Sequence, residues 1–87
     1  MKISFANNDV FEDYNEWTIN DKKIAKKIVT LIRDISRDPY CGLGKPEPLK
    51  YELSGYWSRE ITNEHRLVYK VEDEVIEILS CKFHYKK

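Results

Sequence analysis

The chain has 87 residues, of which 41% are hydrophobic and 34% are charged. This length and composition allow one modest core, so we expect a single domain over residues 1–87 and exclude a disordered chain. The 15 acidic and 15 basic side chains cancel at neutral pH. That balance argues against a protein that binds nucleic acid by bulk electrostatic attraction.

Membrane insertion, secretion and zinc binding are not expected either. No apolar run approaches the roughly 20 residues of a membrane span, and the first residues, Met1–Phe5, do not resemble a signal peptide. The two cysteines, Cys41 and Cys81, lack the CxxC or HxxxH spacing of zinc ligands. We therefore expect free thiols in a reducing cytoplasm, with no metal and no cofactor.

Two amphipathic helices are predicted after a short first strand over residues 2–6. Asn7, Asn8 and Asp9 are good helix caps, and Asp9 with Glu12 has the spacing of a capping box, which predicts a helix from about 9 to 18. A second helix is predicted from Asn20–Asp21 to about 37. The apolar positions at helical spacing are Val10, Tyr14 and Trp17 in the first helix and Ile24, Ile28, Leu31 and Ile35 in the second. The second helix is otherwise basic, with Asp34 as its sole acid, and this run favours either a local basic surface or a solvated face.

Three strands are predicted in the second half, over residues 56–61, 65–71 and 74–83. The turns between them are short, so they form an antiparallel meander. The order β-α-α-β-β-β predicts an α+β domain, with a helical hairpin packed on one face of an antiparallel-rich sheet. Alternation places Leu67, Tyr69 and Val71 on the core face, and Arg66, Val68 and Lys70 on the open face.

The segment 44–50, Gly-Lys-Pro-Glu-Pro-Leu-Lys, presents one carboxylate between two prolines. Each proline fixes its own φ and keeps the preceding residue out of the helical region. The segment is therefore predicted to be stiff and extended around Glu47. Such stiffness suits a loop that aims a general base, although the same pattern is also ordinary turn chemistry.

Several polar side chains can gather around this carboxylate on the open face. If Arg66 and His84 lie on that face, Glu47 can reach them, with the phenol of Tyr85 close by. Lys50 and Arg59 are then cations near the same region.

These residues suit the cleavage of RNA without a metal. The reaction needs a base for the 2′-hydroxyl proton, an acid for the leaving 5′-oxygen and a cation for the charge on phosphorus oxygens. Glu47 suits the base, His84 the acid, and Arg66 a bidentate phosphate contact. The requirement for a 2′-hydroxyl would itself select RNA.

Each assignment has a structural alternative. His84 is equally consistent with a surface histidine near the end of the chain, and Arg66 with a salt bridge to Glu64 or Glu60. His65 is better explained by a structural role than by catalysis. Tyr85 and Trp57 are consistent with aromatic packing as well as with base stacking.

Four blocks, in order and suitably spaced, resemble a known family. They are Gly44–Lys50, the run Leu-Ser-Gly-Tyr-Trp-Ser-Arg ending at Arg59, the run Glu-His-Arg-Leu-Val-Tyr from Glu64, and Cys-Lys-Phe-His-Tyr ending at Tyr85. Together they resemble the Txe/YoeB branch of the RelE superfamily of toxin–antitoxin systems. The resemblance implies a ribosome-dependent endoribonuclease that cuts mRNA in the ribosomal A site, a YefM-type antitoxin as partner, and homodimer formation.

By position, the resemblance makes Glu47 the general base, His84 the general acid and Arg66 the phosphate-stabilising arginine. Tyr85 corresponds to the terminal tyrosine of the site. Lys50 and Arg59 match basic positions near the substrate path.

Two features depart from the family pattern. Arg59 is followed by Glu60 where relatives often have a second arginine, and Lys86 and Lys87 extend the chain beyond the usual His-Tyr ending. The zero net charge is consistent with a ribosome that positions the message. The rival interpretation is a RelE/ParE-fold toxin without ribonuclease activity, which binds a protein target such as a topoisomerase.

Overall fold

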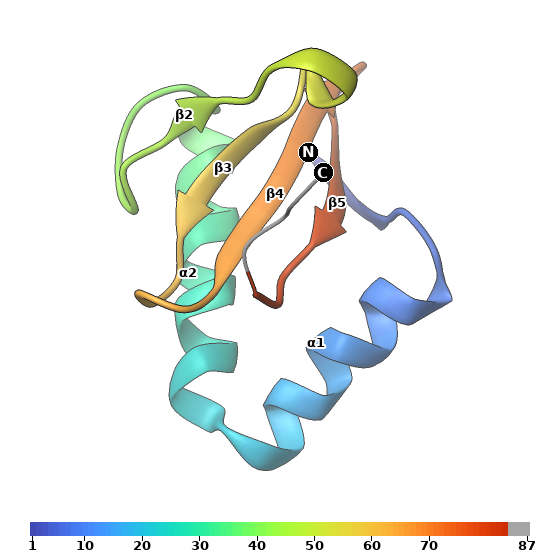
Figure 1. The fold of residues 1–87 in the computed structure, drawn as a ribbon, viewed down its shortest axis with the longest axis vertical. Coiled ribbons are helices and arrows are strands. Elements are labelled where there is room, and N and C mark those ends of the chain that lie inside the picture. The colour runs from blue at the N-terminus through green and yellow to red at the C-terminus, as the bar shows by residue number, and fades with distance from the viewer. Residues whose placement is uncertain (84–87) are drawn as a thin grey trace.

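The structure is a computed structural model that describes residues 1–83. Figure 1 shows two helices that form a V against one side of a sheet. The elements are β1 (Lys2–Phe5), α1 (Asn8–Asn20), α2 (Lys22–Arg37), β2 (Glu47–Pro48), the 3-10 helix η1 (Tyr51–Leu53), β3 (Trp57–Glu60), β4 (Arg66–Glu72) and β5 (Val75–Ser80). This arrangement confirms the predicted α+β fold and adds one short strand, β2.

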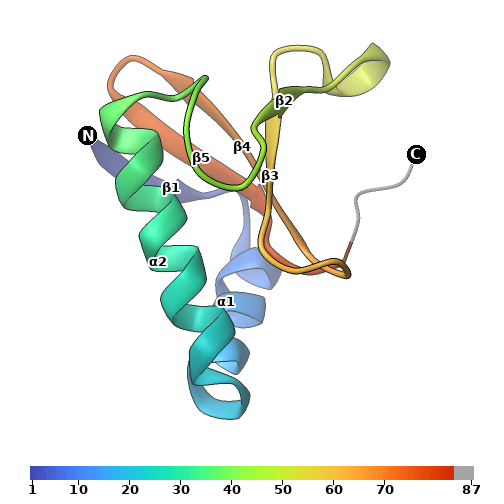
Figure 2. The same ribbon diagram turned by 90° about the vertical axis from the view of Figure 1, so that its left-hand side faces the viewer.

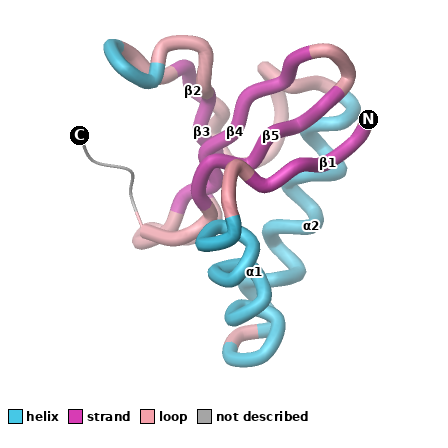
Figure 3. The backbone as a smooth tube through the Cα atoms, turned by 90° about the vertical axis from the view of Figure 1, so that its right-hand side faces the viewer, coloured by secondary structure: helices cyan, strands magenta, loops and turns pink. Residues whose placement is uncertain are grey.

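The sheet has five strands in the order β1-β5-β4-β3-β2. The predicted meander is confirmed, since β3, β4 and β5 pair antiparallel, and β2 joins its edge by pairing with β3. At the other edge β1 runs parallel to β5, with Ile3 opposite Ile76. Figure 3 shows how the helical hairpin carries the chain from β1 at one edge to β2 at the other.

Side-chain caps set the starts of both helices. Asn7 accepts a hydrogen bond from the Val10 amide, so α1 begins one residue before the predicted start, and Asp9 lies inside its first turn. The predicted start of the second helix at Asn20–Asp21 is confirmed, and Asp21 caps α2 by accepting from the Ile24 amide. In the described chain, no helix is both long and apolar enough to span a bilayer.

The core lies between the helices and the sheet. The predicted stripe of α2 is confirmed, because Ile28, Leu31 and Ile35 are fully buried. They pack with Leu67 and Tyr69 of β4 and with apolar residues of β5. Trp17 of α1 is half-buried at the margin of this core.

Two details of the strands differ from the sequence-based expectation. Val68 is buried on the face that alternation leaves open, so that face is partly covered. The last strand ends at Ser80 instead of 83, and Leu79 forms a bulge, because Val68 pairs with Ser80 while Tyr69 pairs with Ile78. The chain then leaves the sheet towards α1.

Candidate active site

Glu47 lies in β2, at the edge of the sheet, opposite Ser58 of β3. Its neighbour is Pro48. A proline has no backbone N–H to donate, and an edge strand tolerates this because its outer side has no partner strand. Strand pairing is limited to Glu47 and Pro48, and Lys50 is also extended. The preceding turn uses left-handed conformations at Gly44 and Lys45, with φ of 78° and 53°, so the stiff extended segment is shorter than predicted.

Gly44 must be glycine because β3 and α2 approach its backbone closely. A Cβ there would lie 3.0 Å from both the Glu60 carbonyl oxygen and a Leu31 methyl. The Glu60 amide donates to the Gly44 carbonyl at 2.6 Å. This contact fixes the chain three residues before Glu47.

Arg59 anchors the rest of the loop that leads to Glu47, which we call the Glu47 loop (residues 38–47). Its side chain is fully buried. All five of its N–H donors have acceptors within the protein: the Tyr69 hydroxyl, the Asp34 carboxylate, and the carbonyls of Asp38, Cys41 and Leu43. The prediction that Arg59 contacts substrate is therefore corrected, since this guanidinium has no donor left to offer.

Asp34 and Tyr69 complete what we call the Arg59 network. Asp34 of α2 accepts from Arg59, from Arg37 and from the Leu43 amide. Tyr69 accepts from Arg59 and donates to the Pro39 carbonyl at 2.6 Å. The network thus satisfies both the buried charges and the inward backbone groups of the Glu47 loop.

The network shifts the protonation equilibria of its members. The Arg37 hydrogen bond, then those from the Leu43 amide and Arg59, hold the pKa of the Asp34 carboxyl far below its ordinary value, against the opposing effect of burial. Burial raises the pKa of the Tyr69 phenol. Burial lowers the pKa of Arg59, but its bonds to Tyr69 and Asp34 outweigh this and raise it overall. The ion pair therefore stays charged at neutral pH.

The structure brings Glu47 and Arg66 together. Arg66 begins β4 opposite Glu60, and its Nη1 lies 3.4 Å from Glu47 Oε1. The side chain of Glu47 is 60% exposed and that of Arg66 is 25% exposed. A carboxylate and a guanidinium thus meet at an open surface, where a ligand can reach both.

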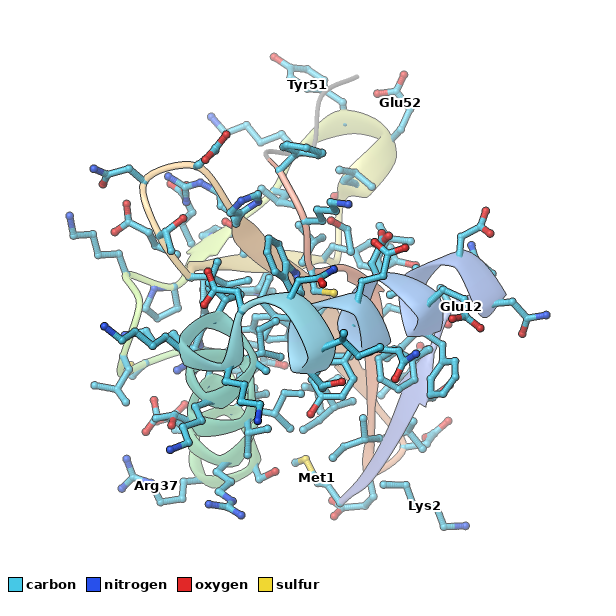
Figure 4. The ribbon with its side chains drawn as sticks, turned by 90° about the horizontal axis from the view of Figure 1, so that it is seen from below. Met1, Lys2, Glu12, Arg37, Tyr51 and Glu52 are labelled. Atoms are coloured by element: carbon cyan, nitrogen blue, oxygen red, sulfur yellow. The ribbon has the colours of Figure 1, made fainter. Side chains whose placement is uncertain are left out.

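The cations and aromatic residues near this pair have different surroundings. Lys50 is exposed at the start of η1, beyond which Tyr51 and Glu52 point outward in Figure 4. Trp57 packs on Tyr40, with ring centroids 4.9 Å apart, which supports the packing interpretation of this tryptophan.

His84 and Tyr85, the other predicted site residues, lie outside the described residues, as do Lys86 and Lys87. The chain that leads to them is described. His65, just before Arg66, is 7% exposed, and its Nδ1 accepts a hydrogen bond from the Phe83 amide at 2.8 Å. The structure thus supports the structural role expected of His65.

Sequence reasoning missed the Arg59 network. One signal was available, because Asp34 is the sole acid in a basic helix and falls on the same side as the apolar stripe. A carboxylate at that position requires a buried cation. The sequence does not indicate which of the many basic residues supplies it.

The sheet order and the one-sided helical hairpin define the class of the protein as the RelE-like fold. The family model for YoeB-like toxins of bacterial type II toxin–antitoxin systems matches residues 6–85. Toxin YoeB of Synechocystis is 54% identical over 87 residues, which cover 100% of both chains. The chain belongs to this family of YoeB-like toxins.

Solved structures agree with this assignment. A YoeB/ParE toxin from Agrobacterium tumefaciens has a TM-score of 0.93 at 46% identity, covering 98% of this chain and 100% of that one. YoeB of Staphylococcus aureus has been solved in a YoeB-YefM complex and as a dimer. Its chains have TM-scores of 0.90, at 50% and 51% identity, with 98% of each chain covered.

Proposed function

We propose that this toxin is a ribosome-dependent endoribonuclease that cuts mRNA in the ribosomal A site and so inhibits translation. In this proposal Glu47 is the general base, His84 the general acid and Arg66 the phosphate-stabilising residue, with Tyr85 in the same site and Lys50 as a substrate contact. The observation that carries the proposal is the pairing of Glu47 with Arg66 at an open surface. Both lie at the positions that the family resemblance implies.

The proposed reaction needs no metal. Glu47 takes the proton of a 2′-hydroxyl, and the 2′-oxygen attacks the adjacent phosphorus. His84 then gives a proton to the departing 5′-oxygen, which leaves a 2′,3′-cyclic phosphate and a 5′-hydroxyl. Arg66 stabilises the negative charge that develops on the non-bridging oxygens.

The weakness of the Glu47–Arg66 ion pair supports the proposed role of Arg66 as a phosphate contact. The contact is long and exposed, and such pairs contribute only about 0–1 kcal/mol. An incoming phosphate can therefore replace the carboxylate as a partner of Arg66 at little cost. The buried Arg59–Asp34 pair has no such freedom, because both side chains are shielded from solvent.

The partners follow from the relatives. We propose a YefM-type antitoxin, as in the Staphylococcus aureus YoeB-YefM complex, and a homodimer, as in the YoeB dimer of that species. The ribosome supplies the message in the cytoplasm. Because the chain has a formal net charge of zero, we expect weak binding and slow cleavage of free RNA.

Primer extension on defined messages tests this proposal. Wild-type protein is added to translating ribosomes and to the same RNA without ribosomes, beside the Glu47→Ala and His84→Ala variants. We expect A-site cleavage only with ribosomes, and a loss of about 10²–10⁴-fold in each variant. Glu12→Ala, which removes an exposed acid of α1, is the matched control and should cleave normally.

Two outcomes contradict the proposal. If the protein cleaved free RNA as fast as ribosome-bound RNA, the proposed dependence on the ribosome would be wrong. Growth arrest that persists in both variants would favour the rival interpretation, a toxin that binds a protein target such as a topoisomerase.

A further inference from the structure

The last described residues, Cys81–Phe83, lie outside the sheet and are held by side chains from distant elements. We call them the C-terminal segment. Trp17 of α1 donates from Nε1 to the Cys81 carbonyl at 3.0 Å, and the Phe83 amide donates to His65 Nδ1 at 2.8 Å. The Phe83 carbonyl accepts from the Arg66 amide at 3.2 Å. Figure 1 shows this dark red end of the described chain between the start of β4 and α1.

His65 is itself firmly placed. Its ring contacts Trp17 edge-on at a centroid distance of 4.8 Å and lies 5.2 Å from the Phe83 ring. Its backbone amide donates to the Thr62 hydroxyl, and its carbonyl accepts from the Ile61 amide. The imidazole therefore has little freedom to move away from the Phe83 amide.

The hydrogen bond also assigns the tautomer of His65. Nδ1 accepts an N–H, so it carries no proton, and the neutral ring holds its proton on Nε2. Nε2 lies 3.7 Å from Glu64 Oε1. His65 thus acts towards the C-terminal segment as an acceptor.

We propose that His65 is a positioning residue that sets the place of the general acid His84 relative to Arg66. This inference rests on the proposed function. His65 and Arg66 bind the N–H and the carbonyl of Phe83, the residue directly before His84. Because consecutive Cα atoms lie about 3.8 Å apart, fixing Phe83 restricts where His84 begins.

Arg66 connects the two halves of the site. Its backbone amide binds Phe83, while its guanidinium pairs with Glu47. The general base Glu47 and the residue directly before the general acid are therefore both in contact with Arg66. A displacement of about 1 Å in such an arrangement can lower a rate about 10²-fold, which is how His65 influences catalysis without touching substrate.

Two substitutions test the hydrogen-bond acceptor and the ring of His65 independently. His65→Phe keeps a planar ring against Trp17 but leaves the Phe83 amide without its acceptor. His65→Asn removes the ring but can place its Oδ1 near the position of Nδ1. If His65 positions the segment through the hydrogen bond, Asn restores part of what Phe loses.

The first test is NMR on the purified protein. We expect wild-type His65 to show the ring ¹⁵N pattern of the neutral Nε2–H tautomer. Exchange of the Phe83 amide should be about tenfold or more faster in His65→Phe, and intermediate in His65→Asn. Equal protection of this amide in all three proteins overturns the proposal.

The second test is steady-state cleavage of ribosome-bound message. His65→Phe should lower kcat about 10–100-fold, with KM changed less than about twofold, and His65→Asn should recover part of kcat. Ile28→Val, a core change in α2, is the control for lowered stability and should retain normal kcat. A folded His65→Phe protein with wild-type kcat, or an Asn variant no better than Phe, overturns the proposal.

Failure of the proposed function is distinguishable from failure of this inference. If Glu47→Ala still cleaves, or wild type does not, the catalytic assignment is wrong. The exchange measurement then decides by itself whether His65 holds the segment that leads to His84.

Discussion

The Glu47 loop and the C-terminal segment both contact Arg66, but different kinds of interaction hold them in place. The loop is held by a buried ion pair whose guanidinium satisfies three of its carbonyls. The segment is held by single hydrogen bonds: an indole and one backbone amide donate to its carbonyls, and an imidazole accepts from its Phe83 amide. A charged network resists local change but depends on every member, whereas neutral contacts can be lost one at a time.

The comparison also concerns solvent. The Arg59 side chain is 0% exposed, while Phe83 is 54% exposed. The Glu47 loop is itself largely exposed, but its inward carbonyls bind this buried guanidinium, so we expect the C-terminal segment to open more readily. We therefore expect the Glu47 loop to be the more rigid of the two regions.

The largest expected effect comes from Arg59→Met. It removes the buried cation that pairs with the Asp34 carboxylate and leaves three loop carbonyls without their donor, so the free energy of unfolding should fall by about 3–5 kcal/mol. Urea denaturation measures this. Lys26→Met, an exposed basic residue of the same helix as Asp34, should change it by less than about 0.5 kcal/mol. A loss no larger than in that control would show that the network does not stabilise the loop.

Acid should weaken the Glu47 loop through Asp34. The pKa of Asp34 is far lower in the folded protein than in the unfolded chain. Its contribution is therefore complete above the ordinary carboxyl pKa and decreases as pH falls below about 4. Urea midpoints between about pH 6 and 2.5 should decline, with a shallower slope in Asp34→Asn. Parallel slopes in the two proteins would contradict this assignment.

Trp17→Phe should have a smaller effect on stability. The change removes the hydrogen bond to the Cys81 carbonyl and should lower the free energy of unfolding by about 1 kcal/mol. Hydrogen exchange should accelerate in the C-terminal segment and stay unchanged in the Glu47 loop. Trp57→Phe, which alters a tryptophan packed on Tyr40, is the matched control and should leave exchange in the segment unaltered.

The smallest stability effect is expected for Glu47→Gln. Its contact with Arg66 is exposed and long, so the free energy of unfolding should change by less than about 0.5 kcal/mol. Cleavage should nevertheless fall about 10²-fold or more, because the base is lost. Glu12→Gln serves as the control in both assays. A strongly destabilised Glu47→Gln protein would mean that the pair is structural.

Local patterns in the sequence predicted much of the fold. The apolar stripe of α2, its start at Asn20–Asp21 and the short turns of the meander each depend on residues a few positions apart. The alternation of β4 and the stiff edge segment also predicted the meeting of Glu47 and Arg66. Figure 2 shows β2 beside β3, which separates it from β4, so only one strand lies between Glu47 and Arg66.

The errors concern contacts between distant residues. The burial of Arg59 depends on Asp34, which lies 25 positions earlier, and on loop carbonyls that bear no sequence signal. The parallel pairing of β1 with β5 joins opposite ends of the chain. The early end of β5 reflects competition from Trp17, which binds the Cys81 carbonyl away from the sheet.

The sequence by itself determined the two helices, the helical hairpin with its meander, and the four blocks that resemble YoeB-like toxins. These depend on local spacing, which the chain carries wherever it folds. Only the tertiary structure decided that Arg59 supports the Glu47 loop from the interior, and that His65 binds the residue before His84. Both outcomes are set by buried polar groups that must find partners, and those partners are chosen by packing and not by position in the chain.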